Sequence, residues 1–550
     1  MARWSVHVKV HLTLIFALAS ALHAANPKSA GSKICSECHA KISRTYSLTP
    51  MAASSGPAGT ALRSPKFDKA SFTDRHSAFD YTAGRDALGY YFDVRGRGPG
   101  TEPAARRRLP YFVGSGVLAS AFLISVDGFL FESPVTWYSH TGAWDLSPGY
   151  ENYSYPFLTR AIVPRCLECH ASGVRAIAGT QNGYATPPFL EGGVGCERCH
   201  GPGDSHVAQM KAGRRGRSAI VNPAALDAER RDSICAQCHL TGDVIVERAG
   251  KEHQPFIPGE KLQDHSIAFV RSSEKSRTTV TSHVENLAQS KCKRVSGDRL
   301  WCGTCHDPHS VPPPSRKAAW FRAKCMTCHA AADCTAPRAV RQSKQDDCTS
   351  CHMPRNPVAD AQHVVYTDHS IPRLPAKRSN VKPSPDAPLT PFGQKTADAR
   401  DLGLAYAIMA VRERNAKYGE RAFDLLKQTI TKTPNDPQVL SYLADLYKKH
   451  SDDRNALSLY ERLRRVDPSE SSAPVALGGY AMERGDYEEA IRYWSDALRK
   501  SPALLLVRAN LAVALLRTGR AGEARAVLEK ALEFHPGFKA ARDLLEKIRP

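Results

Sequence analysis

Residues 301–310 read WCGTCHDPHS, from Trp301 to Ser310. Two cysteines lie three residues apart, a histidine follows the second one directly, and another histidine comes three residues later. Cysteine pairs at this spacing occur in zinc sites, in redox-active dithiols and in sites where a porphyrin is bonded to the chain. One copy does not separate these three possibilities, so the rest of the chain has to decide between them.

The same Cys-x-x-Cys-His pattern occurs seven times in the 550 residues. The copies, numbered 1 to 7 in chain order, are Cys35–Cys38–His39, Cys166–Cys169–His170, Cys196–Cys199–His200, Cys235–Cys238–His239, Cys302–Cys305–His306, Cys325–Cys328–His329 and Cys348–Cys351–His352. Chance would place a histidine after all seven pairs with a probability on the order of 10⁻¹⁰. Zinc sites need no histidine after each pair, and a thioredoxin-type dithiol would occur once, beside a βαβ pattern that we do not find.

The pattern therefore indicates seven covalently attached c-type haems. Two thiols about one helical turn apart can each bond a porphyrin vinyl group, and the adjacent imidazole then becomes the fifth ligand of the iron. All fourteen motif cysteines are predicted to hold haem, and the seven motif histidines are predicted to bind iron.

The first 24 residues have the pattern of an export signal. Arg3 and Lys9 supply a positive end, residues 12–22 form an apolar run, and cleavage is expected after Ala24. The run is shorter than the ~20 residues that span a bilayer, which disfavours an uncleaved anchor. No other stretch is long and apolar enough to cross a membrane. We expect a periplasmic or otherwise extracytoplasmic protein with no transmembrane segment after cleavage.

A second repeat occupies residues 403–550. Prolines recur every 34 residues, at Pro434, Pro468, Pro502 and Pro536. Small residues that precede a large residue by four positions keep the same period, at Ala422, Ala456, Ala490 and Ala524. This order resembles the tetratricopeptide repeat, in which pairs of antiparallel helices stack into an α-solenoid. Such a solenoid presents a concave face to a partner protein or peptide. Here the groove could equally pack on the chain's own N-terminal part.

The regions before the repeats are expected to differ from one another. Residues 371–402 are rich in proline and form a predicted linker. Residues 25–370 are expected to form a mainly α-helical, loop-rich heptahaem domain. Two β-rich runs within residues 119–138 are joined by Asp127–Gly128, a hairpin signal, so a small β-hairpin is expected at about residues 110–140.

Each iron would need one more ligand. Outside the motifs, the export signal and the repeats, nine histidines remain: His76, His140, His206, His253, His265, His283, His309, His363 and His369. We expect His253 and His265 to be surface or capping residues and the other seven to be distal ligands. Met51 is the one methionine kept as a rival. His309 follows His306 on the same local turn, so it should serve a neighbouring haem.

Two further cysteines, Cys292 and Cys334, belong to no motif. In an oxidising compartment they could form a disulfide, or they could be two unrelated thiols.

Several blocks resemble the multihaem cytochromes related to the tetrahaem electron carrier of hydroxylamine oxidation, within the superfamily of nitrite reductase and hydroxylamine oxidoreductase. They are GCERCHGPGDSH, SHVENLAQSKC leading into LWCGTCHDPH, and DCTSCHMPRNP followed by HVVYTDHSI. The resemblance covers about residues 33–370. It implies that His206, His283, His309 and one of His363 or His369 are distal ligands. All seven motifs end in histidine, whereas related reductases attach their catalytic haem through a motif ending in lysine.

The formal charge of +20 would first suggest nucleic-acid binding. Seven haems carry fourteen negatively charged propionates. We therefore expect these propionates to neutralise much of the positive charge within the protein, and we expect no nucleic acid to bind. The predicted function is electron transfer between redox partner proteins. The alternative is a reductase or other oxidoreductase that acts on a small nitrogen or sulfur oxyanion at one open haem, and the sequence leaves open whether the protein is an enzyme.

Overall fold

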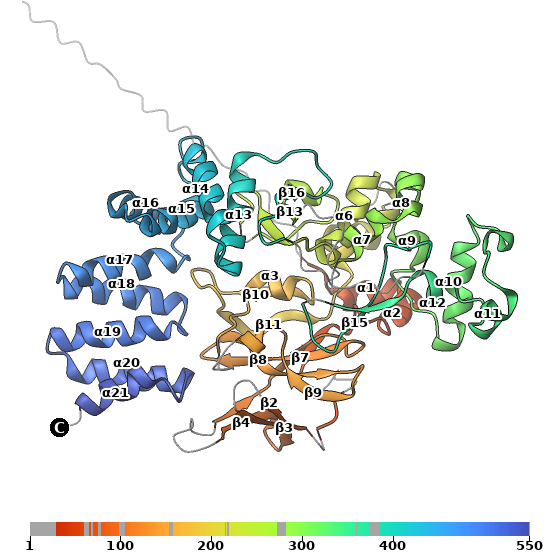
Figure 1. The fold of residues 1–550 in the computed structure, drawn as a ribbon. Coiled ribbons are helices and arrows are strands. Elements are labelled where there is room, and N and C mark those ends of the chain that lie inside the picture. The colour runs from red at the N-terminus through yellow and green to blue at the C-terminus, as the bar shows by residue number, and fades with distance from the viewer. Residues whose placement is uncertain are drawn as a thin grey trace, which may run out of the picture.

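The computed structural model describes residues 29–548 apart from short gaps at 60–64, 68–69, 75–78, 98–104, 153–157, 215, 217–218, 253, 272–281, 359 and 375–383. The expected export signal, His76 and His253 lie outside the described residues. Figure 1 shows a helical solenoid on one side, two sheets in the lower middle and an arm of short helices on the opposite side.

The N-terminal part is rich in β-sheet. A five-stranded sheet has the order β1-β6-β7-β8-β9, and a four-stranded sheet has the order β2-β3-β4-β5. Their bounds are β1 Ser55–Pro57, β2 Ser71–Asp74, β3 Phe79–Asp86, β4 Gly89–Gly96, β5 Ala105–Arg108, β6 Tyr111–Val113, β7 Ala119–Val126, β8 Phe129–Tyr138 and β9 Ala143–Leu146. All pairings are antiparallel, and the two sheets share one apolar core.

The hairpin expected around Asp127–Gly128 is present as β7 and β8. Asp127 has φ 52° and Gly128 has φ 81°, the pair of left-handed conformations that a two-residue hairpin turn requires. This hairpin is the centre of a larger sheet, not an isolated insertion. The expectation of a mainly helical N-terminal domain is therefore only partly right.

The additional strands were missed because each is short or carries glycine and charge. In β3, Phe79, Tyr81 and Ala83 are buried, while Asp80 and Thr82 between them face outward. This alternation is the mark of a half-buried strand. The alternating pattern extends over too few residues to distinguish β3 from the surrounding loops in the sequence. The strand is completed by its antiparallel pairing with β4.

Three smaller sheets follow. Their strands are β10 Ala171–Ala176 with β11 Tyr184–Gly192, β12 Val244–Glu247 with β13 Ser266–Arg271 and β16 Leu389–Pro391, and β14 Arg355–Pro357 with β15 Val365–Thr367. β16 pairs with β13, so the chain returns to this sheet just before the solenoid begins.

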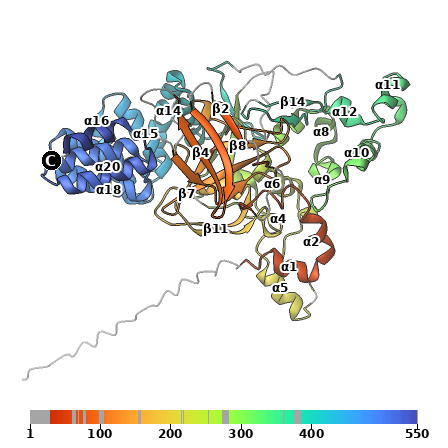
Figure 2. The same cartoon turned by 90° about the horizontal axis from the view of Figure 1, so that it is seen from below.

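Twelve short helices hold most of the motifs. They are α1 Ser32–Cys38, α2 Ala40–Tyr46, α3 Pro164–Glu168, α4 Glu197–His200, α5 Asp204–Lys211, α6 Ala228–His239, α7 His283–Gln289, α8 Lys291–Ser296, α9 Cys302–Cys305, α10 Lys317–Cys325, α11 Arg338–Ser343 and α12 Cys348–His352. The last five form the arm, which Figure 2 shows from below, projecting away from the sheets.

The arm has no protein core. From residue 291 to residue 355 no residue is buried, although this segment contains five helices and motifs 5, 6 and 7. Its large apolar side chains, Val295, Trp301, Val311, Trp320 and Phe321, line a cavity. Ordered helices normally bury an apolar face against another element. Within the described part of this chain, no protein element supplies that contact to the arm.

The solenoid comprises nine helices among the described residues: α13 Ala399–Glu413, α14 Ala416–Thr429, α15 Pro437–Lys449, α16 Asp453–Val466, α17 Ser472–Glu483, α18 Tyr487–Lys500, α19 Leu505–Arg517, α20 Ala521–Phe534 and α21 Lys539–Ile548. The four alanines of the 34-residue period are fully buried. At Gly478 an added Cβ would lie 2.4 Å from the Trp494 ring, so only glycine fits. The small residues of the repeat thus mark where paired helices touch.

Candidate haem sites

A single cavity runs through the cytochrome-like part. Its volume is about 4350 Å³, several times the roughly 300–1,000 Å³ of an ordinary ligand pocket. All seven motif histidines line it, and so do all motif cysteines other than Cys38 and Cys166. The motifs, which span more than 300 residues of sequence, therefore converge on one space.

Local helix geometry brings both thiols of a motif to the same side. Motif 4 ends α6, motif 5 forms α9 and motif 7 forms α12, and residues three apart on a helix share a face. Side-chain caps fix where two of these helices begin: Asp227 accepts a hydrogen bond from the Arg230 N–H, and Asp347 accepts one from the Thr349 N–H.

Thiols from different motifs lie side by side. Burial and then the nearby Cys196 raise the pKa of Cys35 to about 11, and a hydrogen bond with Cys238 lowers the pKa of Cys169 to about 7. Further neighbours are Cys235 with Cys302 and Cys325 with Cys348. Motif 1 thus adjoins motif 3, motif 2 adjoins motif 4, motif 4 adjoins motif 5, and motif 6 adjoins motif 7.

Three motif histidines face a second imidazole across a gap. The ring centroids are 6.4 Å apart for His39 and His206, 5.9 Å for His200 and His309, and 6.2 Å for His306 and His369, with interplanar angles of 19°, 10° and 28°. Two histidine–metal bonds of about 2 Å each, together with the two ring radii, span roughly this separation. The gaps therefore fit a metal ion held between the rings.

A fourth motif histidine touches its partner directly. The rings of His239 and His283 are 4.6 Å apart, and their Nδ1 atoms are 3.2 Å apart. His283 also lies 4.8 Å from His369. Motifs 4 and 5 therefore share one cluster of imidazoles.

Backbone carbonyls orient three of the imidazoles. The Nδ1 atoms of His200, His352 and His369 lie 2.8, 3.0 and 2.9 Å from the carbonyl oxygens of Val221, Pro372 and Thr367. A carbonyl only accepts, so each Nδ1 carries the proton and each Nε2 presents a lone pair. This is the arrangement of histidines that bind metals. The donor set fits haem iron.

His170 of motif 2 has a different environment. Its Nδ1 is buried without a hydrogen bond, and burial, assisted by His239, lowers its pKa to about 4. It is therefore neutral at ordinary pH. In the described part of the chain, ring contacts join the motif histidines His39, His200, His239 and His306 to a second imidazole, but not His170, His329 or His352.

The cavity wall near motif 2 holds a half-buried ion pair. Glu132 of β8 lines the cavity and lies 2.7 Å from Arg160. Burial raises the pKa of Glu132, and the Arg160 guanidinium opposes that rise. Both charges also affect the pKa of Cys166, which Glu132 raises and Arg160 lowers. A carboxyl group and a guanidinium thus stand beside the motif 2 site.

Four of the seven predicted distal histidines line the cavity, namely His206, His283, His309 and His369. His363 does not: its Nε2 lies 2.6 Å from Asp145 Oδ2 and so is already engaged. His140 is exposed in the turn after β8 and also lies outside the cavity. Met51 lines the cavity.

Three other residues correct or complete the expectations. His265 is 2% exposed beside Phe256, so it is not a surface residue; it is the capping residue at the C-terminal end of the 3-10 helix Leu262–Asp264. Cys292 and Cys334 are not joined to each other; Cys292 is half-buried and Cys334 is exposed.

Sequence reasoning missed two residues that position the imidazoles. Buried Glu285 accepts the backbone N–H groups of Thr241 and Gly242 at 2.9 and 2.6 Å, so it ties α7 to the loop that follows motif 4. Tyr366 packs its ring 4.5 Å from His283 and 5.7 Å from His369. Neither belongs to a motif, and only the folded chain brings them to the site.

The fold and the site together define a haem-protein-like body joined to a helical repeat domain. A family model described as cytochrome c554 and c-prime matches residues 141–201, which contain motifs 2 and 3. Two tetratricopeptide repeat models match residues 441–504 and 481–548. The C-terminal helices are therefore tetratricopeptide repeats, as predicted. The cytochrome match is a similarity over a small part of the chain.

Comparison with curated proteins finds cellulose synthase operon protein C of Pseudomonas fluorescens (strain SBW25), which is 26% identical over 166 residues. That match takes 30% of this chain, and the chain spans only 13% of that protein's length.

Several solved structures also match parts of the chain. MamA is 19% identical with a TM-score of 0.22, over 24% of this chain and 76% of that one. YrrB, a TPR protein with an unusual peptide-binding site, is 15% identical with a TM-score of 0.23, over 26% and 74%. PilF of Pseudomonas aeruginosa is 22% identical with a TM-score of 0.24, over 27% and 68%. Within the described residues, no helix has both the length and the apolarity needed to cross a membrane.

Proposed function

We propose that this chain is an extracytoplasmic cytochrome that transfers electrons through seven covalently bound c-type haems, and that its repeat domain makes protein contacts. The observation that carries the proposal is the arm. Residues 291–355 form five helices around three motifs without one buried residue, and their apolar side chains line the cavity. Porphyrins bonded to the motif thiols would supply the missing core.

The chain's own residues would perform distinct tasks. The motif cysteines would anchor each porphyrin, and the motif histidines would bind its iron. His206, His309 and His369 face His39, His200 and His306 across gaps that fit a metal ion, and His283 is proposed for His239. When bound, haem iron supplies reversible one-electron transfer. A six-coordinate iron suits this task because no ligand has to bind or leave.

The placement of the proposed distal histidines favours a closely spaced row of haems. His206 follows motif 3 in the sequence but faces motif 1, and His309 follows motif 5 but faces motif 3. The segment of motif 3 and His206 thus contributes to sites 3 and 1, and the segment of motif 5 and His309 contributes to sites 5 and 3. Adjacent thiols at motifs 4 and 5 and at motifs 6 and 7 support the same inference for the arm.

The proposed organisation is an export signal at residues 1–24, a heptahaem domain at 25–370, a connecting segment at 371–402 and the repeat domain at 403–550. Electrons would pass between a donor and an acceptor protein outside the cytoplasm.

The test is to count haems and spin states. The exported full chain is purified, its haem is quantified as the pyridine complex, and its intact mass is measured. We expect seven haems per chain and mainly low-spin spectra. A colourless protein, or one that carries zinc in place of iron, would refute the proposal.

A second candidate function is reduction of a small oxyanion at motif 2. It is favoured by one observation: Glu132, which lines the cavity, and Arg160 form an ion pair at the wall adjacent to motif 2. Carbon monoxide added to the reduced protein distinguishes the two functions. A spectral shift equivalent to one haem supports this candidate, and an unchanged spectrum supports electron transfer alone.

A further inference from the structure

The solenoid is fixed to the cytochrome-like body at its first helix. One apolar core continues from Val246 and Phe269 of the β12-β13-β16 sheet into α13 and the helices after it. Buried Arg400 of α13 contacts Glu252 at 3.1 Å and the Glu247 carbonyl at 2.6 Å, both on the body. This end of the solenoid is therefore an extension of the body.

The solenoid contacts the body again at its far end, through α20. Phe534 is 1% exposed and belongs to the core between the two N-terminal sheets, with its ring 6.1 Å from that of Phe131 on β8. Lys530 lies 2.6 Å from Asp127 at the hairpin turn, and Arg107 donates to the Glu533 carbonyl. Figure 1 shows the end of α20 beside these sheets.

The strand that Phe534 contacts is also a wall of the cavity. Successive side chains of a strand point to opposite faces. Phe131 meets Phe534, whereas the next residue, Glu132, lines the cavity together with Thr136 and Tyr138. β8 therefore contacts the solenoid through Phe131 and lines the cavity through Glu132.

We propose that the repeat domain is a brace that positions this wall: Phe534 of α20 holds β8, and β8 holds Glu132 in place beside motif 2. A protein that binds the solenoid and displaces its α20 end would thereby alter the cavity. The brace depends on protein contacts alone, so it stands even if the proposed haem function fails.

Hydrogen exchange on the full-length chain tests the brace. In Phe534→Ala we expect amides of Phe129–Tyr138 to exchange at least about tenfold faster than in the wild type. Phe423→Ala is the matched control, because Phe423 packs inside the solenoid against Tyr447 and His450 and contacts neither sheet. We expect its β8 amides to exchange as in the wild type.

A milder variant guards against a chain that fails to fold. Lys530→Met removes the ion pair to Asp127 at the surface and should speed β8 exchange in the same direction by a smaller factor. The proposal is overturned if both variants leave β8 exchange unchanged while α20 and α21 exchange faster. It is also overturned if Phe423→Ala speeds β8 exchange as much as Phe534→Ala does.

Discussion

His369 and His363 lie six residues apart, yet the structure gives them different surroundings. His369 donates its Nδ1 proton to the Thr367 carbonyl and turns toward His306, while the Nε2 of His363 is engaged by Asp145. A sequence containing both could not decide between them, because the choice depends on which backbone carbonyl or carboxylate lies within reach.

We predict that His369→Ala converts one haem from low-spin to high-spin, because the motif 5 iron loses its sixth ligand. The measurement is electron paramagnetic resonance of the oxidised protein. His363→Ala is the control and should leave the number of low-spin irons unchanged. Equal spectra for the two variants would contradict the assigned pairing.

A second prediction concerns His535 at the end of α20. Burial, with a contribution from Arg542, lowers its pKa from the ordinary 6.5 to about 4. The unfolded chain therefore takes up this proton first as the pH falls. Stability that is present above pH 6.5 is lost as the pH falls toward about 4.

We expect the urea midpoint of the solenoid, followed by helical circular dichroism, to fall between pH 7 and pH 4.5. In His535→Gln the fall should be smaller. His450→Gln replaces the other solenoid histidine, which lies 3.6 Å from Glu420, and should keep the wild-type slope. The same slope in all three proteins would show that His535 is not responsible.

At the level of elements, α13 joins the two halves of the chain. Arg400 is 6% exposed and contacts Asp401 and Asp436, both at 2.7 Å, besides its contacts with the body. Removing one partner of a buried ion pair leaves the other charges uncompensated and costs about 3–5 kcal/mol.

Arg400→Met is therefore expected to lower the free energy of unfolding by about 3–5 kcal/mol in urea titration. Arg465→Met on α16 removes an exposed arginine and should change it by less than about 0.5 kcal/mol. A loss no greater than that of the control would mean that the Arg400 network contributes little.

Elements differed in how well the sequence predicted them. The repeats were predictable because small and large residues keep a 34-residue register, and the structure buries the four marker alanines together. The β7–β8 hairpin was predictable from Asp127–Gly128. The four-stranded sheet was not, because strands such as β2 are only four residues long and gain their core from distant partners.

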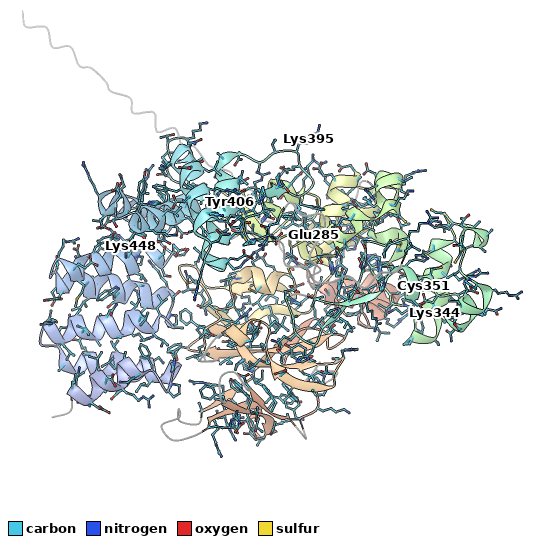
Figure 3. All side chains as sticks on the ribbon, in the orientation of Figure 1. Glu285, Lys344, Cys351, Lys395, Tyr406 and Lys448 are labelled. Carbon is cyan, nitrogen blue, oxygen red and sulfur yellow. The ribbon has the colours of Figure 1, made fainter. Side chains whose placement is uncertain are left out.

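For the whole molecule, the arm and the solenoid lie at opposite ends. Figure 3 labels Cys351 and Lys344 on the arm and Lys448 on the solenoid, with the sheets and Glu285 between them. The solenoid has a continuous buried core, and the arm has none.

We predict that the arm loses its structure when its haem is withheld. In the exported double variant Cys325→Ala, Cys328→Ala, limited proteolysis should cut within residues 311–347, while the solenoid stays intact. The double variant Cys35→Ala, Cys38→Ala lacks one haem elsewhere and should leave the arm resistant. An arm that resists the protease in both variants would show that it holds itself together without porphyrin.

The pairing of His206 with motif 1, His309 with motif 3 and His369 with motif 5 has a consequence for how such a chain can change over evolutionary time. In each of these three pairs, the second histidine comes from a stretch of sequence well downstream of the motif that it faces, so the proposed centres overlap along the sequence. Excising motif 3 with its trailing histidine would also disable motif 1. Under the proposed pairings, losing the stretch that holds motif 3 or motif 5 would affect two centres at once, so we expect these stretches to be gained or lost together.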